Sequence, residues 1–274
     1  MIDVILVVVI YSALILFVYV NLFFIAAILI KDNSIIDIGW SVGFILVAVV
    51  SLLISGAENI LNLRKFLVTG LVSIWALRLS IHIFLRSRRK GEDWRYKKWR
   101  EEWGRWFIPR SYFQIFIGQG VGILVISSAI IIVNTISSTN LTLLDGLGLF
   151  IWLIGFFFET VSDWQLSCFK KDPQNEGKIM TQGLWKYSRH PNYFGDATMW
   201  WGLFLMAASV EFPLGLLGII SPIAITSTLL LYSGVPILET RYKDNEKYKE
   251  YAKRTSIFFP WFPKKIVRDD KKNN

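Results

Sequence analysis

Long runs of apolar residues constrain this chain more than any other feature of its sequence. The first run covers residues 4–30 with almost no charge, and others follow at 35–55, 66–85, 113–136, 143–163, 195–210 and 214–238. A helix needs about 20 apolar residues to cross roughly 30 Å of hydrocarbon, and most of these runs are long enough. The sequence therefore predicts an all-α fold, a polytopic membrane bundle of about seven transmembrane helices, and it excludes a soluble globular enzyme.

The basic residues predict how these helices are oriented. With seven spans, all but three of the 30 lysines and arginines lie in loops on one side of the membrane. Arg64 and Lys65 lie on the other side, and Arg78 lies within a span. Cytosolic loops carry such an excess, so we expect the N-terminus outside and the C-terminus cytosolic. We assign the net charge of +9 to contact with membrane lipids and to topology, and we expect no nucleic-acid partner.

Several kinds of chemistry are excluded by the residues that the chain lacks. It has one cysteine, Cys168, and two histidines, His82 and His190, so it predicts neither a disulfide nor a metal site. No G-x-G-x-x-G motif follows a strand, and there is no P-loop. We expect a monomeric multi-pass protein, and the lack of an N-terminal targeting extension favours the bacterial inner membrane over the endoplasmic reticulum.

We interpret residues 1–274 as a single integral membrane domain with two halves. Residues 1–112 form a three-helix half on the substrate side with an interfacial helix, residues 113–263 form a cofactor-binding half, and residues 264–274 form a frayed tail. In the interfacial helix, Trp99, Trp103 and Trp106 follow one another at helical spacing and predict an aromatic anchor. Residues 239–254 predict one further helix.

Ionisable residues within the spans are candidates for function, because a charge in hydrocarbon is costly. Asp37 opens the second span, and Arg78 and His82 lie one turn apart in the third. The fifth, sixth and seventh spans add the carboxylates Glu159, Asp163, Asp196 and Glu239. Each of them also fits a structural ion pair between helices, such as Arg78 with Asp37, and the sequence leaves both readings open.

The segment 183–196 is the densest polar region of the chain. Gly183 and Gly195 permit tight turns, and Pro191 keeps a helix from continuing through it. Between the two glycines lie arginine, histidine, asparagine and two tyrosines, and Asp196 follows Gly195 directly. Three lysines come shortly before the segment. Basic side chains bind phosphates or carboxylates, and aromatic rings flank flat ligands. Alternatively, the segment is only a polar loop at the membrane interface. The number of polar residues that it places beside carboxylates of the spans favours a ligand site.

The pattern Gly-x-x-x-x-x-Arg-His-Pro-Asn-Tyr at residues 183–193, followed by Asp196, resembles the C-terminal signature of the steroid 5-alpha-reductase-like membrane proteins. The resemblance is to the branch known as DUF1295, and it extends over nearly the whole chain. It also includes residues 37–40, 75–79, 93–96, 159–165, Glu239, Tyr251 and Pro260. The Arg-His-Pro core alone is shared with isoprenylcysteine and phospholipid methyltransferases and with sterol reductases.

The resemblance implies a cytosol-facing NADPH site among the C-terminal helices. The residues that it places around the cofactor are Glu159, Asp163, Lys170, Trp185, Tyr187, Arg189, His190, Asn192, Tyr193, Asp196 and Glu239. The catalytic acid pair of such enzymes comes from the N-terminal half. Asp37 and Tyr96 are the nearest equivalents in this chain.

These residues suggest a membrane-embedded NADPH-dependent reductase of a C=C bond in a lipophilic enone such as a steroid, a polyprenyl compound or a fatty substrate. A tyrosine hydroxyl paired with a carboxylate would stabilise the enolate that forms after hydride transfer, without a metal. An S-adenosylmethionine-dependent lipid or isoprenylcysteine methyltransferase is the alternative among enzymes. A non-enzymatic lipid-binding or transport protein is the alternative in another class.

Overall fold

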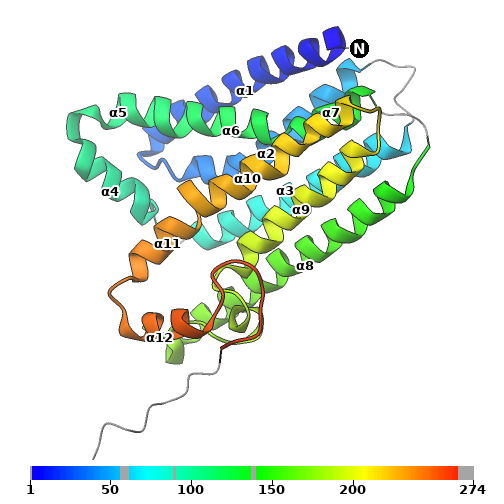
Figure 1. Cartoon of the computed structure of the whole chain (residues 1–274). Helices are drawn as coiled ribbons and strands as arrows, with labels where there is room; N and C mark the ends of the chain where they lie inside the picture. The colour runs from blue at the N-terminus through cyan, green and yellow to red at the C-terminus, as the bar shows by residue number, and fades with distance from the viewer. Residues whose placement is uncertain (1, 56–61, 89–90, 137–139, 265–274) are drawn as a thin grey trace, which may run out of the picture. The chain divides into compact units, whose positions relative to one another are not determined.

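The computed structural model of the chain describes residues 2–55, 62–88, 91–136 and 140–264. Over these residues the chain is helical, with an isolated bridge between Ser188 and Ser256 and no strand, so the expected all-α fold is confirmed (Figure 1). Of the predicted frayed tail, residues 265–274 lie outside the described residues.

The helices follow the predicted apolar runs closely. In chain order they are α1 (Ile2–Ile30), α2 (Ile35–Ile54), α3 (Leu63–Ser87), α4 (Trp94–Trp103), α5 (Phe107–Arg110), α6 (Gly118–Ile126), α7 (Ser128–Ile136), α8 (Leu143–Lys171), α9 (Pro191–Ala208), α10 (Ile220–Ser227), α11 (Val235–Tyr242) and α12 (Glu246–Arg254). Short 3-10 or π-helical turns extend or join several of them, as at Ser111–Ile117 and Leu214–Ile219.

Side-chain caps define the first residue of three helices. Asn62, Asp93 and Asn245 precede α3, α4 and α12, and each accepts a hydrogen bond of 3.0–3.1 Å from a backbone N–H two or three residues later. The first N–H groups of a helix have no partner within the helix, so these oxygens stabilise its start.

Five helices are long and apolar enough to cross a membrane, namely Ile2–Ile30, Ile35–Ile54, Leu63–Ser87, Leu143–Lys171 and Leu214–Tyr242. A sixth span results if the run Trp94–Ile126 and α7, which meet at a bend of 44°, count as one broken span. The chain is therefore an integral membrane protein. The count of about seven spans and the orientation of the termini stay predictions. Over the predicted sixth span, α9 is not among the helices that are both long and apolar enough to cross.

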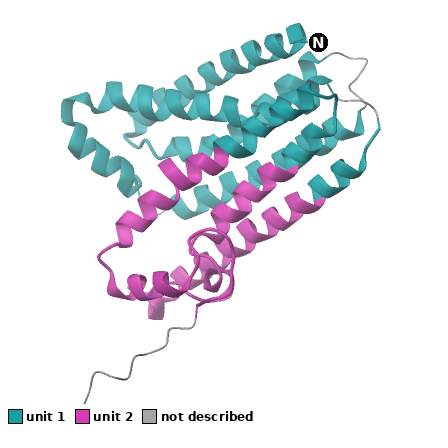
Figure 2. Cartoon of the chain, viewed as in Figure 1, with its two compact units in different colours: residues 1–149, 203–224 teal, residues 150–202, 225–274 magenta. Residues whose placement is uncertain are grey.

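The chain divides into two compact units whose sequence ranges interleave (Figure 2). Unit 1 comprises residues 1–149 and 203–224, and unit 2 comprises residues 150–202 and 225–274. The expected division into a substrate-side half, residues 1–112, and a cofactor-binding half, residues 113–263, concerns function and stays a prediction.

Unit 1 is organised around α2, which packs against both α1 and α3. Aromatic side chains fill the contact with α3, where the Phe44 ring lies 5.0 Å from Trp40 and 5.4 Å from Trp75, in both cases edge to face. Such edge-to-face pairs stabilise a helix contact beyond the burial of their area. This contact fixes α2, whose first turn carries Asp37.

An enclosed ion pair joins α3 to α8 within unit 1. Arg64 and Asp145 are 0% and 2% exposed, and Arg64 Nε lies 2.7 Å from Asp145 Oδ1. The same carboxylate accepts hydrogen bonds from Thr142 N at 2.6 Å and from Ser209 Oγ at 2.9 Å. A buried pair needs such additional partners, because both charges have lost their hydration.

In unit 2, α8 and α9 approach closely at two glycines. A Cβ atom at Gly155 would lie 2.5 Å from the Gly195 carbonyl oxygen and 2.6 Å from Met199 N. Backbone therefore packs directly on backbone at this crossing. The contact sets the start of α9, which carries Asn192 and Asp196, beside the stretch of α8 that carries Glu159.

Two predicted helices are shorter than expected. The interfacial helix ends at Trp103 because Gly104 adopts a φ of 49°, which favours glycine. Trp106 therefore lies beyond the helix, and the prediction that it shares one helical face with the other two tryptophans was wrong. Residues 239–254 form α11 and α12 instead of one helix, since Asn245 caps a new start.

The Arg64–Asp145 pair provides a test of this packing. We expect Arg64→Met to lower the free energy of unfolding by about 3–5 kcal/mol, because it leaves the Asp145 carboxylate buried without its cation. Thermal unfolding in detergent measures the effect, with Arg105→Met at an exposed position as the control. Equal melting temperatures for the two variants would contradict this role.

Candidate functional site

Asp37, Arg95 and Tyr96 form a hydrogen-bonded cluster in unit 1. Asp37 lies in the first turn of α2, and the other two residues lie in the first turn of α4. The Tyr96 hydroxyl donates to Asp37 Oδ1 over 2.6 Å, and Arg95 Nη2 donates to Asp37 Oδ2 over 2.6 Å. The structure thus brings together the two residues that the sequence named as catalytic candidates.

Asp93 fixes the arginine of this cluster. Its Oδ1 accepts from Arg95 N at 3.0 Å and from Arg95 Nε at 2.9 Å. Burial raises the pKa of the Asp93 carboxyl, but the attraction of the Arg95 guanidinium outweighs it, so the pKa lies below its ordinary value. Asp93 is therefore ionised at neutral pH, and Arg95 is held between two carboxylates.

Glu92, which the sequence analysis missed, links α4 to the segment before α2 through an ion pair with Arg100 and a hydrogen bond from Asn33. Arg100 Nη2 donates to Glu92 Oε1 at 2.7 Å, and the same oxygen accepts from Asn33 N at 3.0 Å. The available signal was a pair of acidic residues followed by four basic residues within residues 92–100. The pair holds the start of α2 against the start of α4, and so brings Asp37 within reach of Tyr96.

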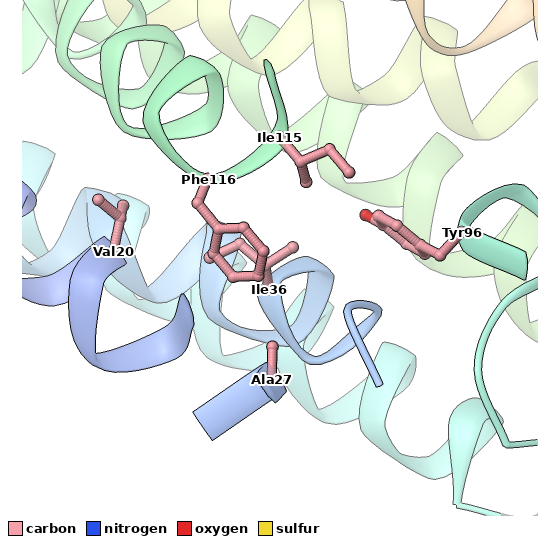
Figure 3. Close-up of a cluster of buried hydrophobic side chains, with 6 residues drawn as sticks. All are labelled: Val20, Ala27, Ile36, Tyr96, Ile115 and Phe116. Atoms are coloured by element: carbon pink, nitrogen blue, oxygen red, sulfur yellow. The ribbon is translucent and has the colours of Figure 1, made fainter. Parts of the chain in front are cut away.

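Tyr96 is 2% exposed and belongs to an apolar cluster (Figure 3). The Trp99 ring packs edge-on against it, with the ring centroids 5.5 Å apart. The other buried members of the cluster are Val20, Ala27, Ile36, Ile115 and Phe116. The hydroxyl is thus a polar tip in apolar surroundings, where a hydrogen bond to a charged group is strong.

The second group of candidates lies in unit 2, around the turn before α9. Gly183 adopts a φ of 59°, and Gln165 of α8 accepts a hydrogen bond from Leu184 N at 3.0 Å. The Trp185 indole donates to the Ser162 carbonyl at 3.0 Å. These contacts hold the turn against the last part of α8, and α9 begins only at Pro191.

Glu239 of α11 is the centre of this group. It forms an ion pair with Arg189, and its Oε1 lies 2.9 Å from His190 Nε2. The same oxygen accepts from the Tyr248 hydroxyl at 2.5 Å. The carboxylate thus requires a proton on His190 Nε2, which leaves Nδ1 as the second functional atom of the ring. His190 also stacks on Tyr193, with the ring centroids 5.5 Å apart.

Two tyrosines of α12 support this arrangement, and the cofactor prediction had omitted both. Burial, followed by the hydrogen bond to Glu239, raises the pKa of Tyr248, and burial raises the pKa of Tyr251, so both stay protonated donors. Tyr251 donates to the carbonyl oxygens of Trp185 and Ser188. The three-residue spacing of the two tyrosines, which puts them on one helical face, was the available signal.

Among the residues that the structure describes, five buried side-chain polar atoms of unit 2 have no hydrogen-bond partner. Three of them lie within four consecutive residues, namely Arg189 Nε, His190 Nδ1 and Asn192 Oδ1. The other atom of the Asn192 amide donates to Asp163 Oδ1 at 3.2 Å, which fixes its orientation. Buried polar groups seldom stay unpaired, so these atoms point to a ligand with complementary groups.

The remaining predicted cofactor residues differ in environment. Glu159 is buried, and Asp196 is buried with the Trp200 indole on its Oδ1 at 3.2 Å. Tyr187 is half-buried, and Lys170 is exposed at the end of α8. Their contact with a cofactor stays a prediction. Over the described ranges, there is no group of three or more His, Cys, Asp or Glu side chains that could hold a metal ion.

A family model described as "Protein of unknown function (DUF1295)" matches residues 23–255. The chain is similar to 3-oxo-5-alpha-steroid 4-dehydrogenase 1 of Rattus norvegicus, with 29% identity over 119 residues, which cover 42% of this chain and 40% of that protein. It is also similar to an uncharacterized protein of Schizosaccharomyces pombe, with 24% identity over 172 residues, which cover 55% of this chain and 50% of that protein. The chain thus spans half or less of these relatives. No solved structure matches it.

The lowered pKa of Asp93 predicts an acid-sensitive stability. Its stabilising effect is complete above the ordinary pKa of 3.8 and is lost as the pH falls through the lower pKa of the folded protein. We expect Asp93→Asn to melt at a lower temperature than wild type at pH 7, and this difference to shrink as the pH is lowered below the ordinary pKa of 3.8. Melting curves in detergent measure it, and exposed Asp244→Asn is the control. A difference that is constant with pH would refute the assignment.

Proposed function

Because the chain belongs to the DUF1295 family, we propose that it is a membrane reductase that uses NADPH to reduce the C=C bond of a lipophilic enone. Its rat relative is named a 3-oxo-5-alpha-steroid 4-dehydrogenase, an oxidoreductase of a 3-oxo steroid, which motivates the reaction class. The hydrogen bond of 2.6 Å between Tyr96 and Asp37 is the observation that carries the proposal.

Reduction of an enone adds one hydride and one proton, and the two are handled by different groups. NADPH, when bound, supplies the hydride to the carbon β to the carbonyl. Tyr96 holds the proton, and its hydroxyl turns from Asp37 to the substrate carbonyl oxygen, to which it passes the proton as the enolate forms. Apolar surroundings strengthen that hydrogen bond.

Arg95 and Asp37 complete the role of this tyrosine. The Arg95 guanidinium carbon lies 5.4 Å from the centre of the Tyr96 ring, so its positive charge stabilises the phenolate that remains after proton transfer. Asp37 Oδ1, 2.6 Å from the phenolic oxygen, is the group through which a proton returns. The ion pair with Arg95 keeps that carboxylate oriented.

The residues of unit 2 fit a ligand with several negative charges and hydroxyl groups. Arg189, Lys170 and Lys171 are candidates for its phosphates, with Lys178 and Lys186 nearby in sequence. His190 Nδ1 and Asn192 Oδ1, oriented by Glu239 and Asp163, suit hydroxyl or amide groups. A lipophilic substrate agrees with a chain in which five or six of the described helical segments are long and apolar enough to cross a membrane.

The role of Tyr96 has a kinetic test. We expect Tyr96→Phe to lower turnover by about 10²-fold or more with little change in NADPH affinity, because it removes a proton donor and leaves unit 2 intact. NADPH oxidation with a 3-oxo-4-ene steroid as the probe measures turnover. Tyr112→Phe, which loses a hydroxyl from the same unit, is the control. Wild-type turnover of Tyr96→Phe would reassign Tyr96 to packing.

The cofactor has a separate test. We expect detergent-purified protein to be stabilised by NADPH more than by NADH. At 100 times its Kd, NADPH would raise the free energy of unfolding by about 2.7 kcal/mol. The double variant Lys170→Ala/Lys171→Ala should lose most of this preference, because the 2′-phosphate distinguishes the two ligands. Lys247→Ala/Lys249→Ala on exposed α12 is the control. Stabilisation by S-adenosylmethionine alone would overturn the reductase in favour of a methyltransferase.

A further inference from the structure

The end of the described chain closes into a loop after α12. Lys264 N donates to the Arg254 carbonyl oxygen over 2.9 Å, so residues 254–264 begin and end at one point. Loops of about 6–16 residues with adjoining ends are compact Ω-loops. We call residues 254–264 the C-terminal loop.

One side of the C-terminal loop is bound to the turn before α9. Arg189 N donates to the Ser256 carbonyl at 2.8 Å, and Trp261 N donates to the Tyr187 carbonyl at 2.9 Å. Within the same contact, Ser188 Oγ donates to the Phe258 carbonyl at 2.7 Å. These bonds fix the loop on unit 2 and bury Phe258 against it.

The other side of the C-terminal loop is apolar and exposed. Phe259, Trp261 and Phe262 are 70%, 72% and 77% exposed, and they lie within four consecutive residues. A cluster of large exposed side chains on an ordered loop indicates an interaction site, since each of them loses free energy in water.

The contacts of the loop place this cluster at the depth of a membrane interface. The turn that it binds is held to Ser162 and Gln165, which lie about 20 residues into α8, where a hydrocarbon span of roughly 30 Å ends. The Phe259 ring lies 5.6 Å from Phe194 of α9, and the Phe194 ring lies 5.1 Å from Phe158 of α8. Aromatic contacts thus continue from a membrane-spanning helix to the loop.

The charge around the cluster is of one sign. Residues 251–265 contain four basic residues and no acidic residue. Arg254 and Lys264, whose backbones close the loop, are both exposed, and Lys186 is exposed in the turn beneath it. Cations flanking aromatic rings suit the region of anionic headgroups, with the rings at the level of the lipid carbonyls.

We propose that the C-terminal loop is an interfacial anchor, which inserts Phe259, Trp261 and Phe262 into the headgroup region of the bilayer and binds its anionic lipids through Arg254 and Lys264. The anchor does not depend on the proposed reaction. Because the loop is bonded to residues 187–189, it also holds the Arg189–His190 segment at a fixed depth.

Site-specific fluorescence in nanodiscs that hold one copy of the full chain tests this proposal. In a Cys168→Ser background, which removes the sole cysteine, the variant Phe262→Cys carries an environment-sensitive nitrobenzoxadiazole label. Lys247→Cys on the exposed face of α12 carries the control label, and Trp261→Cys gives a second position if the first variant does not fold. Lipids with a nitroxide near the headgroup are the quenchers.

We expect quenching at residue 262 to exceed that at residue 247 at least about 2-fold, with a blue-shifted emission. Adding phosphatidylglycerol to phosphatidylcholine discs should increase the quenching at residue 262. The changes Arg254→Gln and Lys264→Gln should abolish the increase, since these cations attract the anionic headgroups. Equal quenching at both positions would overturn the anchor. A blue-shifted emission at residue 262 that is seen only in discs with two copies of the chain would also overturn the anchor. It would assign the exposed aromatic cluster to contact between copies.

Discussion

Hydrocarbon offers no hydrogen bonds, and this one property of the surroundings governs how the chain uses its polar residues. Helices satisfy the backbone within each span, so the spans need only apolar side chains. A charged side chain at such a site must bring its partners with it. Arg64 shows the rule, since its guanidinium is fully buried and bonded to Asp145 and to the Asn140 carbonyl.

The two candidate groups follow the same rule, each within its own unit. Asp37 holds Tyr96 and Arg95 in the first, and Glu239 holds Arg189, His190 and Tyr248 in the second. In both, one carboxylate orients several donors and leaves reactive or binding atoms fixed in place. Preorganisation of this kind is what proton transfer and cofactor binding require.

Much of this could be read from the sequence because hydrophobicity and local turn chemistry are local properties. The apolar runs gave both ends of α1, α2 and α3 to within three residues and the first residue of α8, which continues eight residues beyond its predicted end. The free-energy cost of placing a charge in hydrocarbon singled out Asp37 and Glu239. The many polar residues of segment 183–196 indicated a ligand site. Gly104 and Asn245, which shorten two predicted helices, act through backbone conformation and capping, which apolar periodicity does not report.

The sequence by itself determined the helical membrane fold, the family and the residue types available for chemistry, because each depends on composition and spacing along the chain. Tertiary structure decided which of these residues meet. Asp37 meets Tyr96, 59 positions away in sequence, where Glu92 and its neighbours hold α4 at the start of α2. Tyr248, Tyr251 and the C-terminal loop join the turn around His190 through backbone hydrogen bonds and side-chain contacts. Nothing local in the sequence encodes these pairings, because any backbone carbonyl group can accept a hydrogen bond. The packing of helices that are distant in sequence selects which carbonyl group accepts it.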